Sequence, residues 1–248
     1  MFAIGVGIPF LRSGGALFNP AVQFAPNLNC LWYYPGDYTT LSQDSAGTTP
    51  VTAVTQPVGR MLDKSGRNNT ILQATATARP ITNTQGSAQY LTFDGVNSGM
   101  GTGAITLDAN MDCFIAVRRA TAANVVLVAP TVGSGSFFGV IQSGNASGAD
   151  SGNVGAPTYA ANGIALNGGA VGTTRDQLHL AVTVGAWVVV EIRNLNLATG
   201  WTTLIIGNYS GFLLNGDIGG IILAPAGTAT ARQQNRQYLG AKVGLTLP

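Results

Sequence analysis

Short apolar runs separated by Gly, Asn, Ser and Pro follow one another along the chain from Leu31 onward. Runs of this kind, bounded by turn residues, are typical of β-strands. The run 188–192 is apolar at every position except Glu191, which is typical of a strand covered on both faces. The pattern therefore predicts an all-β protein. The residues expected to form strands are 113–118, 125–129, 137–142, 179–184, 187–192 and 201–206.

One stretch near the end has the composition of a helix. Residues 229–240 contain several Arg and Gln residues, which are good helix formers. Thr228 or Thr230 can cap its beginning, and Gly240 or Gly244 can end it. We expect this to be the one clear helix of the chain. By contrast, residues 144–172 are rich in Gly, Asn and Ser, which predicts long loops around weak strands at most.

The first 26 residues place apolar side chains between glycines and prolines. We expect residues 1–26 to form an extended arm, and residues 27–248 to form a single sandwich domain, which the length of the chain allows. Apolar side chains of an arm are costly to expose, so we expect them to contact a neighbouring subunit. Packing of the arm on its own domain is the open alternative. The residues expected to make this contact are Phe2, Ile4, Ile8, Phe10 and Leu11.

Composition narrows the range of partners. Only 9% of the 248 residues are charged and the net charge is +2, so we expect no nucleic-acid partner. No apolar run approaches the length of a membrane-spanning helix, and nothing at the beginning resembles a signal peptide. We therefore expect synthesis in a host cytoplasm without membrane insertion. Cys30 and Cys113 are the two cysteines; their spacing predicts neither a metal site nor a disulfide framework, but two buried, reduced thiols.

Three motifs give the chain a family resemblance. A polar turn at 62–69 is followed by a Phe-Asp-Gly at 93–95, and a Gly-Asp stands at 216–217 before an apolar run. They resemble the opening and closing strands of laminin G-like domains in the concanavalin A-like lectin/glucanase superfamily. The segments 32–37 and 44–51 resemble such modules in bacteriophage structural proteins. The residues that carry the turn signature are Asp63, Ser65, Gly66, Asn68, Phe93, Asp94, Gly95, Gly216 and Asp217.

The resemblance covers roughly residues 32–245 and implies a two-sheet antiparallel jelly-roll β-sandwich with a short C-terminal helix. It also implies that Asp63 and Asp94 hold turns by accepting backbone N–H bonds. In many members of the family a small residue and then an acid follow the Gly-Asp-Ile that stands here at 216–218, but this sequence has Gly219 and Gly220 at those two positions. This departure weakens a metal-site interpretation, and we expect no metal or other cofactor.

Because the superfamily includes glucanases, catalysis has to be tested. Glycosidases generally need two carboxylates across the sugar. The paired acidic strand motif of the family glucanases is absent, and Glu191 is the one glutamate. Arg193 shares its strand face, which favours a satisfied or edge-facing charge. His179, the one histidine, is expected in the core or at a strand edge. The sequence therefore predicts a protein that is not an enzyme.

The sequence favours a structural protein of a bacteriophage virion. It would be a capsid decoration protein, head fibre or tail component, held among other virion proteins by its arm, with the sandwich facing outward. From the family resemblance we expect a homo-oligomer, and a trimer is one of the forms that it could take. A carbohydrate-binding adhesin module that recognises host surface glycans is the alternative, and a glycoside hydrolase is a weaker one. The aromatic residues that could contact a glycan are Trp32, Tyr34 and Tyr159.

Overall fold

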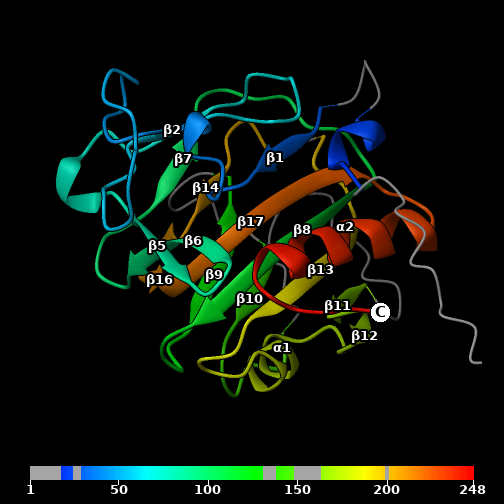
Figure 1. Cartoon of the computed structure of the whole chain (residues 1–248). Helices are drawn as coiled ribbons and strands as arrows, with labels where there is room; N and C mark the ends of the chain where they lie inside the picture. Colours follow the sequence, from blue (N-terminus) through cyan, green and yellow to red (C-terminus); the bar gives the residue numbers. More distant parts are fainter. Residues whose placement is uncertain (1–17, 25–28, 131–137, 148–162, 199–200) are drawn as a thin grey trace, which may run out of the picture.

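Two large antiparallel sheets enclose the main core of the protein (Figure 1). The computed structural model describes residues 18–24, 29–130, 138–147, 163–198 and 201–248. The predicted arm contacts Phe2, Ile4, Ile8, Phe10 and Leu11, and the candidate glycan contact Tyr159, lie outside these described residues.

The first sheet, here called sheet A, has eight strands among the described residues. Its spatial order is β12-β11-β13-β8-β17-β6-β5, and β1 pairs with β17 off this path. The strands are β12 (Gly169–Ala170), β11 (Ile164–Leu166), β13 (Val188–Leu195), β8 (Met111–Arg119), β17 (Asn215–Pro225), β6 (Ala88–Asp94), β5 (Ile81–Gln85) and β1 (Leu31–Tyr33).

The second sheet, sheet B, has seven strands in the described part of the chain, in the order β10-β9-β14-β7-β4-β3-β2. They are β10 (Phe138–Ile141), β9 (Val125–Ala129), β14 (Ile205–Ile206), β7 (Met100–Thr102), β4 (Ile71–Leu72), β3 (Arg60–Met61) and β2 (Leu41–Ser42). A small hairpin of β15 (Asn208–Tyr209) and β16 (Phe212–Leu213) is separate from both sheets. The described residues also contain three short 3-10 helices: η1 (Pro20–Gln23), η2 (Tyr38–Thr40) and η3 (Ala76–Ala78). The predicted all-β, two-sheet antiparallel sandwich is confirmed.

Alternation along the strands of sheet A fills two separate apolar layers. In β8, Cys113 and Ile115 face the core between the sheets, whereas Phe114 and Ala116 face outward into a second cluster. Strand β13 alternates in the same way and lies between β11 and β8. The prediction that its apolar run would be covered on both faces is therefore confirmed.

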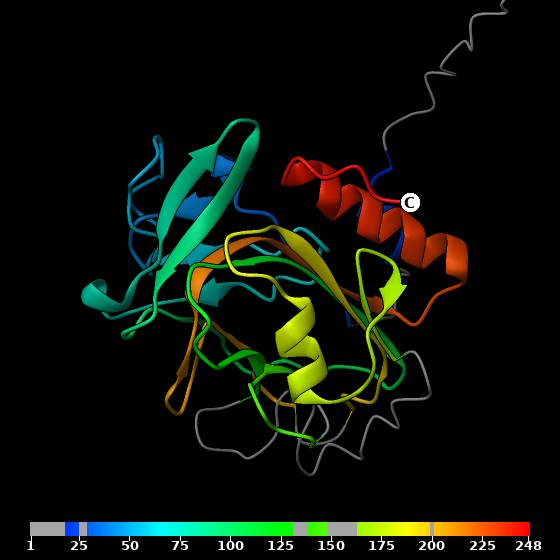
Figure 2. The ribbon, with the colours of Figure 1, turned by 90° about the horizontal axis from the view of Figure 1, so that it is seen from below.

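Helix α2 (Ala229–Lys242) covers the outer face of sheet A, where it crosses the sheet in Figures 1 and 2. Its beginning is capped by Thr228, whose side chain accepts a hydrogen bond from the amide of Ala231. Leu239 is fully buried in the second apolar cluster, together with Phe114 and Ala116 of β8. Gly244, with φ near 79°, follows the end of the helix. The predicted C-terminal helix is confirmed, with its end two residues later than the 229–240 expected from the sequence.

Buried charges fix α2 on the sheet. The carboxylate of Asp112 on β8 is 1% exposed and accepts hydrogen bonds from the guanidinium of Arg232, with the Nε–Oδ2 pair 2.7 Å apart. It also accepts bonds from the amides of Asn194 and Gly227. A buried carboxylate needs this full set of partners because desolvation otherwise disfavours its charge.

Two adjacent glycines let α2 approach the sheet. Strand β17 has an irregular register between Ile218 and Gly220, opposite β8. A Cβ atom on Gly219 would lie 2.2 Å from a methyl group of Val243, and one on Gly220 would lie 2.9 Å from Leu239. The absence of an acid at this point in the sequence is therefore explained by close packing of the helix.

A second helix, α1 (Arg175–Ala181), replaces part of the strand expected at 179–184, so that expectation is wrong. A capping box starts the helix: Thr174 accepts from the amide of Gln177, and the Gln177 side chain accepts from the amide of Thr174. Buried Arg119 of β8 donates to the backbone carbonyls of His179 and Val182 near its end. His179 is thus a helical residue, not a strand residue.

The irregular stretch before β14 also differs from expectation. Only Ile205–Ile206 of the expected strand 201–206 pairs regularly. Trp201 and Leu204 are nevertheless buried, and the amide of Leu204 donates to the hydroxyl of Thr102 instead of to a strand ladder. The carbonyl oxygens of Thr202 and Leu204 still accept from the amides of Ile105 and Thr102, so backbone pairing continues irregularly here. Neither helix of the described residues has the length and apolar composition needed to span a membrane.

We predict that Gly219→Ala destabilises the protein, because its new methyl group overlaps Val243. An expected loss of about 1–3 kcal/mol in the free energy of unfolding follows from overpacking. Gly103→Ala is the matched control, since nothing lies within 4 Å of its added Cβ. Urea unfolding of both variants checks this, and equal stability of the two would contradict the packing argument.

We also predict that His179 makes stability depend on pH. Burial, followed by the nearby Arg119 charge, lowers the pKa of His179 below its ordinary 6.5, while Asp176 opposes the shift. Arg119 Nη1 lies 3.1 Å from Nδ1, which accepts only in the neutral ring. The folded state therefore favours neutral His179, so its contribution is present above about pH 6.5 and is lost as pH falls through the folded-state pKa.

Urea midpoints measured at small pH steps between about pH 7.5 and 5 should fall in the wild type and change less in His179→Gln. Identical slopes in the two proteins would show that another group titrates in this range.

Candidate functional site

The carboxylate of Asp63 lies at the centre of the first signature turn. It accepts hydrogen bonds from the amides of Trp32 (2.9 Å), Ser65 (2.8 Å) and Asn69 (3.3 Å). The left-handed backbone at Gly66 and Asn68, with φ of 84° and 59°, closes the turn. Asp63 therefore ties β1 to this turn, and its lone pairs point into the protein.

Asp94 has the same role in the Phe-Asp-Gly motif. Its Oδ1 accepts from the amides of Val96 (2.8 Å), Asn97 (3.0 Å) and Ser98 (3.0 Å). Burial alone would raise the pKa of Asp94, but these backbone hydrogen bonds outweigh it and lower the pKa. Gly95, with φ of 70°, has no room for a side chain because a Cβ would lie 2.6 Å from Asn215.

Phe93 and the Gly216-Asp217 pair belong to the sheet itself. Phe93 is fully buried in the core between the sheets. A Cβ on Gly216 would lie 2.3 Å from the carbonyl oxygen of Arg118. Asp217 accepts from Arg118 Nε at 2.8 Å and from the hydroxyl of Thr92 at 2.7 Å. The signature residues are therefore distributed over turns and strands, and each of the three acids among them accepts hydrogen bonds from groups of the protein itself.

Glu191 is enclosed between sheet A and α2. It is 0% exposed, and its carboxylate accepts from Arg236 Nη1 at 3.0 Å and from Arg193 Nη2 at 2.8 Å. Arg236 also donates to the carbonyl oxygen of Pro248. The expectation of a satisfied structural charge is confirmed, and Glu191 does not face a sheet edge.

The aromatic candidates for glycan contact differ in exposure. Trp32 is only 7% exposed, because Phe24 and Tyr238 lie against its ring with centroid distances of 6.2 and 5.7 Å. It therefore packs α2 and η1 onto β1 and does not offer an open ring face. Tyr34 is half-buried and lies beside Tyr238, with the Lys242 ammonium 4.7 Å from the Tyr34 ring centroid.

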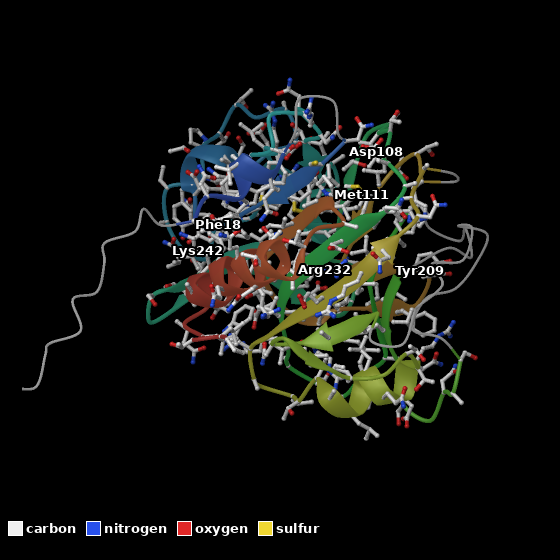
Figure 3. The ribbon with its side chains drawn as sticks, turned by 90° about the vertical axis from the view of Figure 1, so that its right-hand side faces the viewer. Phe18, Asp108, Met111, Tyr209, Arg232 and Lys242 are labelled. Atoms are coloured by element: carbon white, nitrogen blue, oxygen red, sulfur yellow. The ribbon has the colours of Figure 1, made fainter. Side chains whose placement is uncertain are left out.

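Beside Tyr238, α2 and the N-terminal segment border a groove of about 310 Å³, which we call the α2 groove. Figure 3 shows two of its residues, Phe18 and Lys242, next to each other at the end of α2. The Lys242 ammonium lies over the rings of Tyr34 and Tyr238. The residues that line the groove are Phe18, Gln234, Gln237, Tyr238, Ala241 and Lys242.

Sequence reasoning did not identify the α2 groove. The lining residues that belong to α2 recur at spacings of three and four, and this pattern could have indicated from the sequence that they share one helix face. Phe18, however, is more than two hundred positions away in the sequence, and nothing in its local pattern places it beside α2.

Among the residues that the structure describes, the thiols and the acidic side chains form no cluster suited to a metal. Cys30 and Cys113 are free and buried, as expected, and burial raises the pKa of Cys30 to about 12 and that of Cys113 further. Within the described ranges, no group of three or more His, Cys, Asp or Glu side chains could hold a metal ion.

We predict that removing the Glu191 charge destabilises the protein strongly, because it leaves buried Arg236 without its counter-charge. Glu191→Gln should lower the free energy of unfolding by about 3–5 kcal/mol. The comparison variant is Asp37→Asn, which breaks the more exposed pair with Lys64 and should cost less than about 1 kcal/mol. Urea unfolding measures both, and similar losses would contradict the buried role of Glu191.

Comparison with known proteins gave no match to this chain among protein-family models, curated proteins or solved structures.

Proposed function

We propose that this protein is a non-enzymatic structural part of a bacteriophage virion, a capsid decoration protein, head fibre or tail component. In this proposal the β-sandwich is a rigid outward-facing body. The part of the predicted arm that precedes Phe18, residues 1–17, makes the contact with other virion proteins. The laminin G-like resemblance of the turn motifs motivates the proposal, and the use of the acidic side chains supports it.

The part of the proposal that excludes enzymatic activity rests on the hydrogen bonds that the carboxylates accept. The sequence contains ten acidic residues, and Asp150 lies outside the described residues. Every other carboxylate accepts hydrogen bonds from the protein itself. These residues are Asp37, Asp44, Asp63, Asp94, Asp108, Asp112, Asp176, Glu191 and Asp217. Such acids hold turns and pair with arginines, a use that suits a durable scaffold better than acid–base chemistry.

The attachment of the N-terminal segment supports the second part of the proposal. The Gln23 amide donates to the carbonyl oxygen of Ala231, and its oxygen accepts from buried Asn235 at 2.7 Å. Phe18 packs edge-on against Tyr238, with ring centroids 6.4 Å apart. Residues 18–24 therefore give the preceding segment a fixed point of departure from the folded body.

A carbohydrate-binding role is the second candidate, and the composition of the α2 groove favours it. Tyr238 offers a ring, Gln234 and Gln237 offer amides, and Lys242 offers an ammonium group. Aromatic rings beside hydrogen-bonding groups are a common arrangement in ligand sites. A glycan array probed with the full-length protein and with folded protein that lacks residues 2–17 tests this candidate, and Gln237→Ala should weaken any signal that arises from the groove.

The virion proposal predicts that the protein is present at fixed stoichiometry in purified particles of the phage that encodes it. Deletion of residues 2–17 should sharply reduce its copy number, because the remaining sandwich loses its assembly contact. Quantitative mass spectrometry of particles measures this, and total protein from the infected cells controls for expression.

Two results would overturn parts of this proposal. Absence of the full-length protein from purified particles would exclude a virion role. Full incorporation of the shortened protein would exclude the arm as its attachment.

A further inference from the structure

We propose that, before assembly, the α2 groove receives apolar side chains from the N-terminal segment of its own chain, residues 2–11. The inference goes beyond the proposed virion role, because it concerns the isolated protein and a different contact of the same segment.

The groove runs beside one face of α2. Gln234, Gln237, Tyr238, Ala241 and Lys242 recur at helical spacings of three and four, so their side chains form one stripe along the helix. A neighbouring stripe, which includes Leu239, is buried on sheet A. The lining stripe is therefore the side of α2 that sheet A leaves open.

The chemistry of the groove suits an apolar segment with an extended backbone. Phe18 and Tyr238 provide ring surface, and Ala241 adds no bulk at the wall. The amides of Gln234 and Gln237 can both donate to and accept from peptide groups. The Lys242 ammonium is placed over two aromatic rings, so its charge is already compensated in part.

The sequence before Phe18 indicates which segment occupies the groove. Residues 1–17 contain a single charged side chain, Arg12. Bulky apolar residues stand at every second position from Phe2 to Phe10, with Ala, Gly or Pro between them. An extended segment with this alternation has one bulky apolar face and one small face. Exposure of that apolar face to water would be unfavourable.

The short connection favours the chain's own segment over a second copy. Phe18 itself forms one wall of the groove, and seven residues separate it from Phe10. Gly14 and Gly15 stand midway in the sequence of this connection, and glycine permits the backbone conformations that tight turns require. A tether this short gives an effective concentration of roughly millimolar. At lower protein concentrations the intramolecular contact is therefore favoured.

Tryptic cleavage after Arg12 tests the proposal on the purified full-length protein. Arg12 lies in the connection between residues 2–11 and Phe18, and both of these are held at the groove in this proposal. Cleavage then requires release of the apolar segment. Its rate should be lower by about tenfold or more than that of a synthetic peptide of residues 1–19. Ala241→Trp places a large side chain in the groove and should restore a rate close to that of the peptide. Gln233→Trp is the matched control, since Gln233 is exposed on α2 but does not line the groove.

The source of the segment is tested by dilution and by cross-linking. Protection should be unchanged over a roughly hundredfold range of protein concentration if the contact is intramolecular. A bifunctional maleimide should link Phe10→Cys to Gln237→Cys within one chain, and should link Phe10→Cys to Leu180→Cys on distant α1 much less. Retention of folded-state circular dichroism is required of each variant.

Three outcomes would overturn the proposal. Cleavage of the wild type at the peptide rate would show that the segment is not docked. Protection that survives Ala241→Trp would place it elsewhere, and protection lost on dilution, with cross-linked dimers, would assign the groove to a second copy. None of these depends on whether the protein is found in phage particles, so this test and the virion test can fail separately.

Discussion

The packing of α2 against the outer face of sheet A is the constraint on which the rest of the structure depends. Neighbouring strands β8 and β13 carry Asp112 and Glu191 on that face, and a buried carboxylate is unfavourable without a cation. Arg232 and Arg236, one turn apart on α2, provide both cations. These two ion pairs fix the position of the helix along the sheet, while Gly219 sets how closely it approaches.

This arrangement also limits the chemistry of the sandwich. A carboxylate that acts on a sugar needs an open side toward its substrate. Glu191 is instead covered by α2, and Asp217 is held by Arg118 and Thr92. The helix therefore converts a sheet face that could have carried a binding cleft into a second apolar core. What remains open at its side is the α2 groove, whose lining includes no acidic residue.

Much of this fold could be predicted from local patterns. Apolar runs bounded by turn residues identified β8, β9, β10 and β13, because strand formation there is dictated by burial on both faces. Helix α1 was missed for a physical reason: Leu178, Leu180 and Val182 alternate as in a strand, and this pattern concealed the capping box of Thr174 and Gln177. The buried cation that completes α1, Arg119, is some sixty positions away in the sequence.

Residues whose role is to leave space were harder to interpret. The Gly219-Gly220 pair was interpreted as a missing acid, although the structure shows a place where any side chain would meet α2. The turn roles of Asp63 and Asp94 were accessible because an acid accepting nearby amides is a local event. The α2 groove was not accessible, because its wall residue Phe18 and its helix are brought together only by the complete fold.

The wide separation in sequence between the N-terminal segment and α2 determines when this segment can be anchored during folding. Gln23 bonds to Ala231 and Asn235 across more than two hundred positions of sequence, so its anchor cannot form until nearly the whole chain has folded. The position of Phe18, to which residues 1–17 are joined, is therefore defined only after α2 has docked on sheet A. A contact made through that segment would then be available in its correct position only on molecules whose sandwich is complete, which couples any assembly through the arm to the completion of folding.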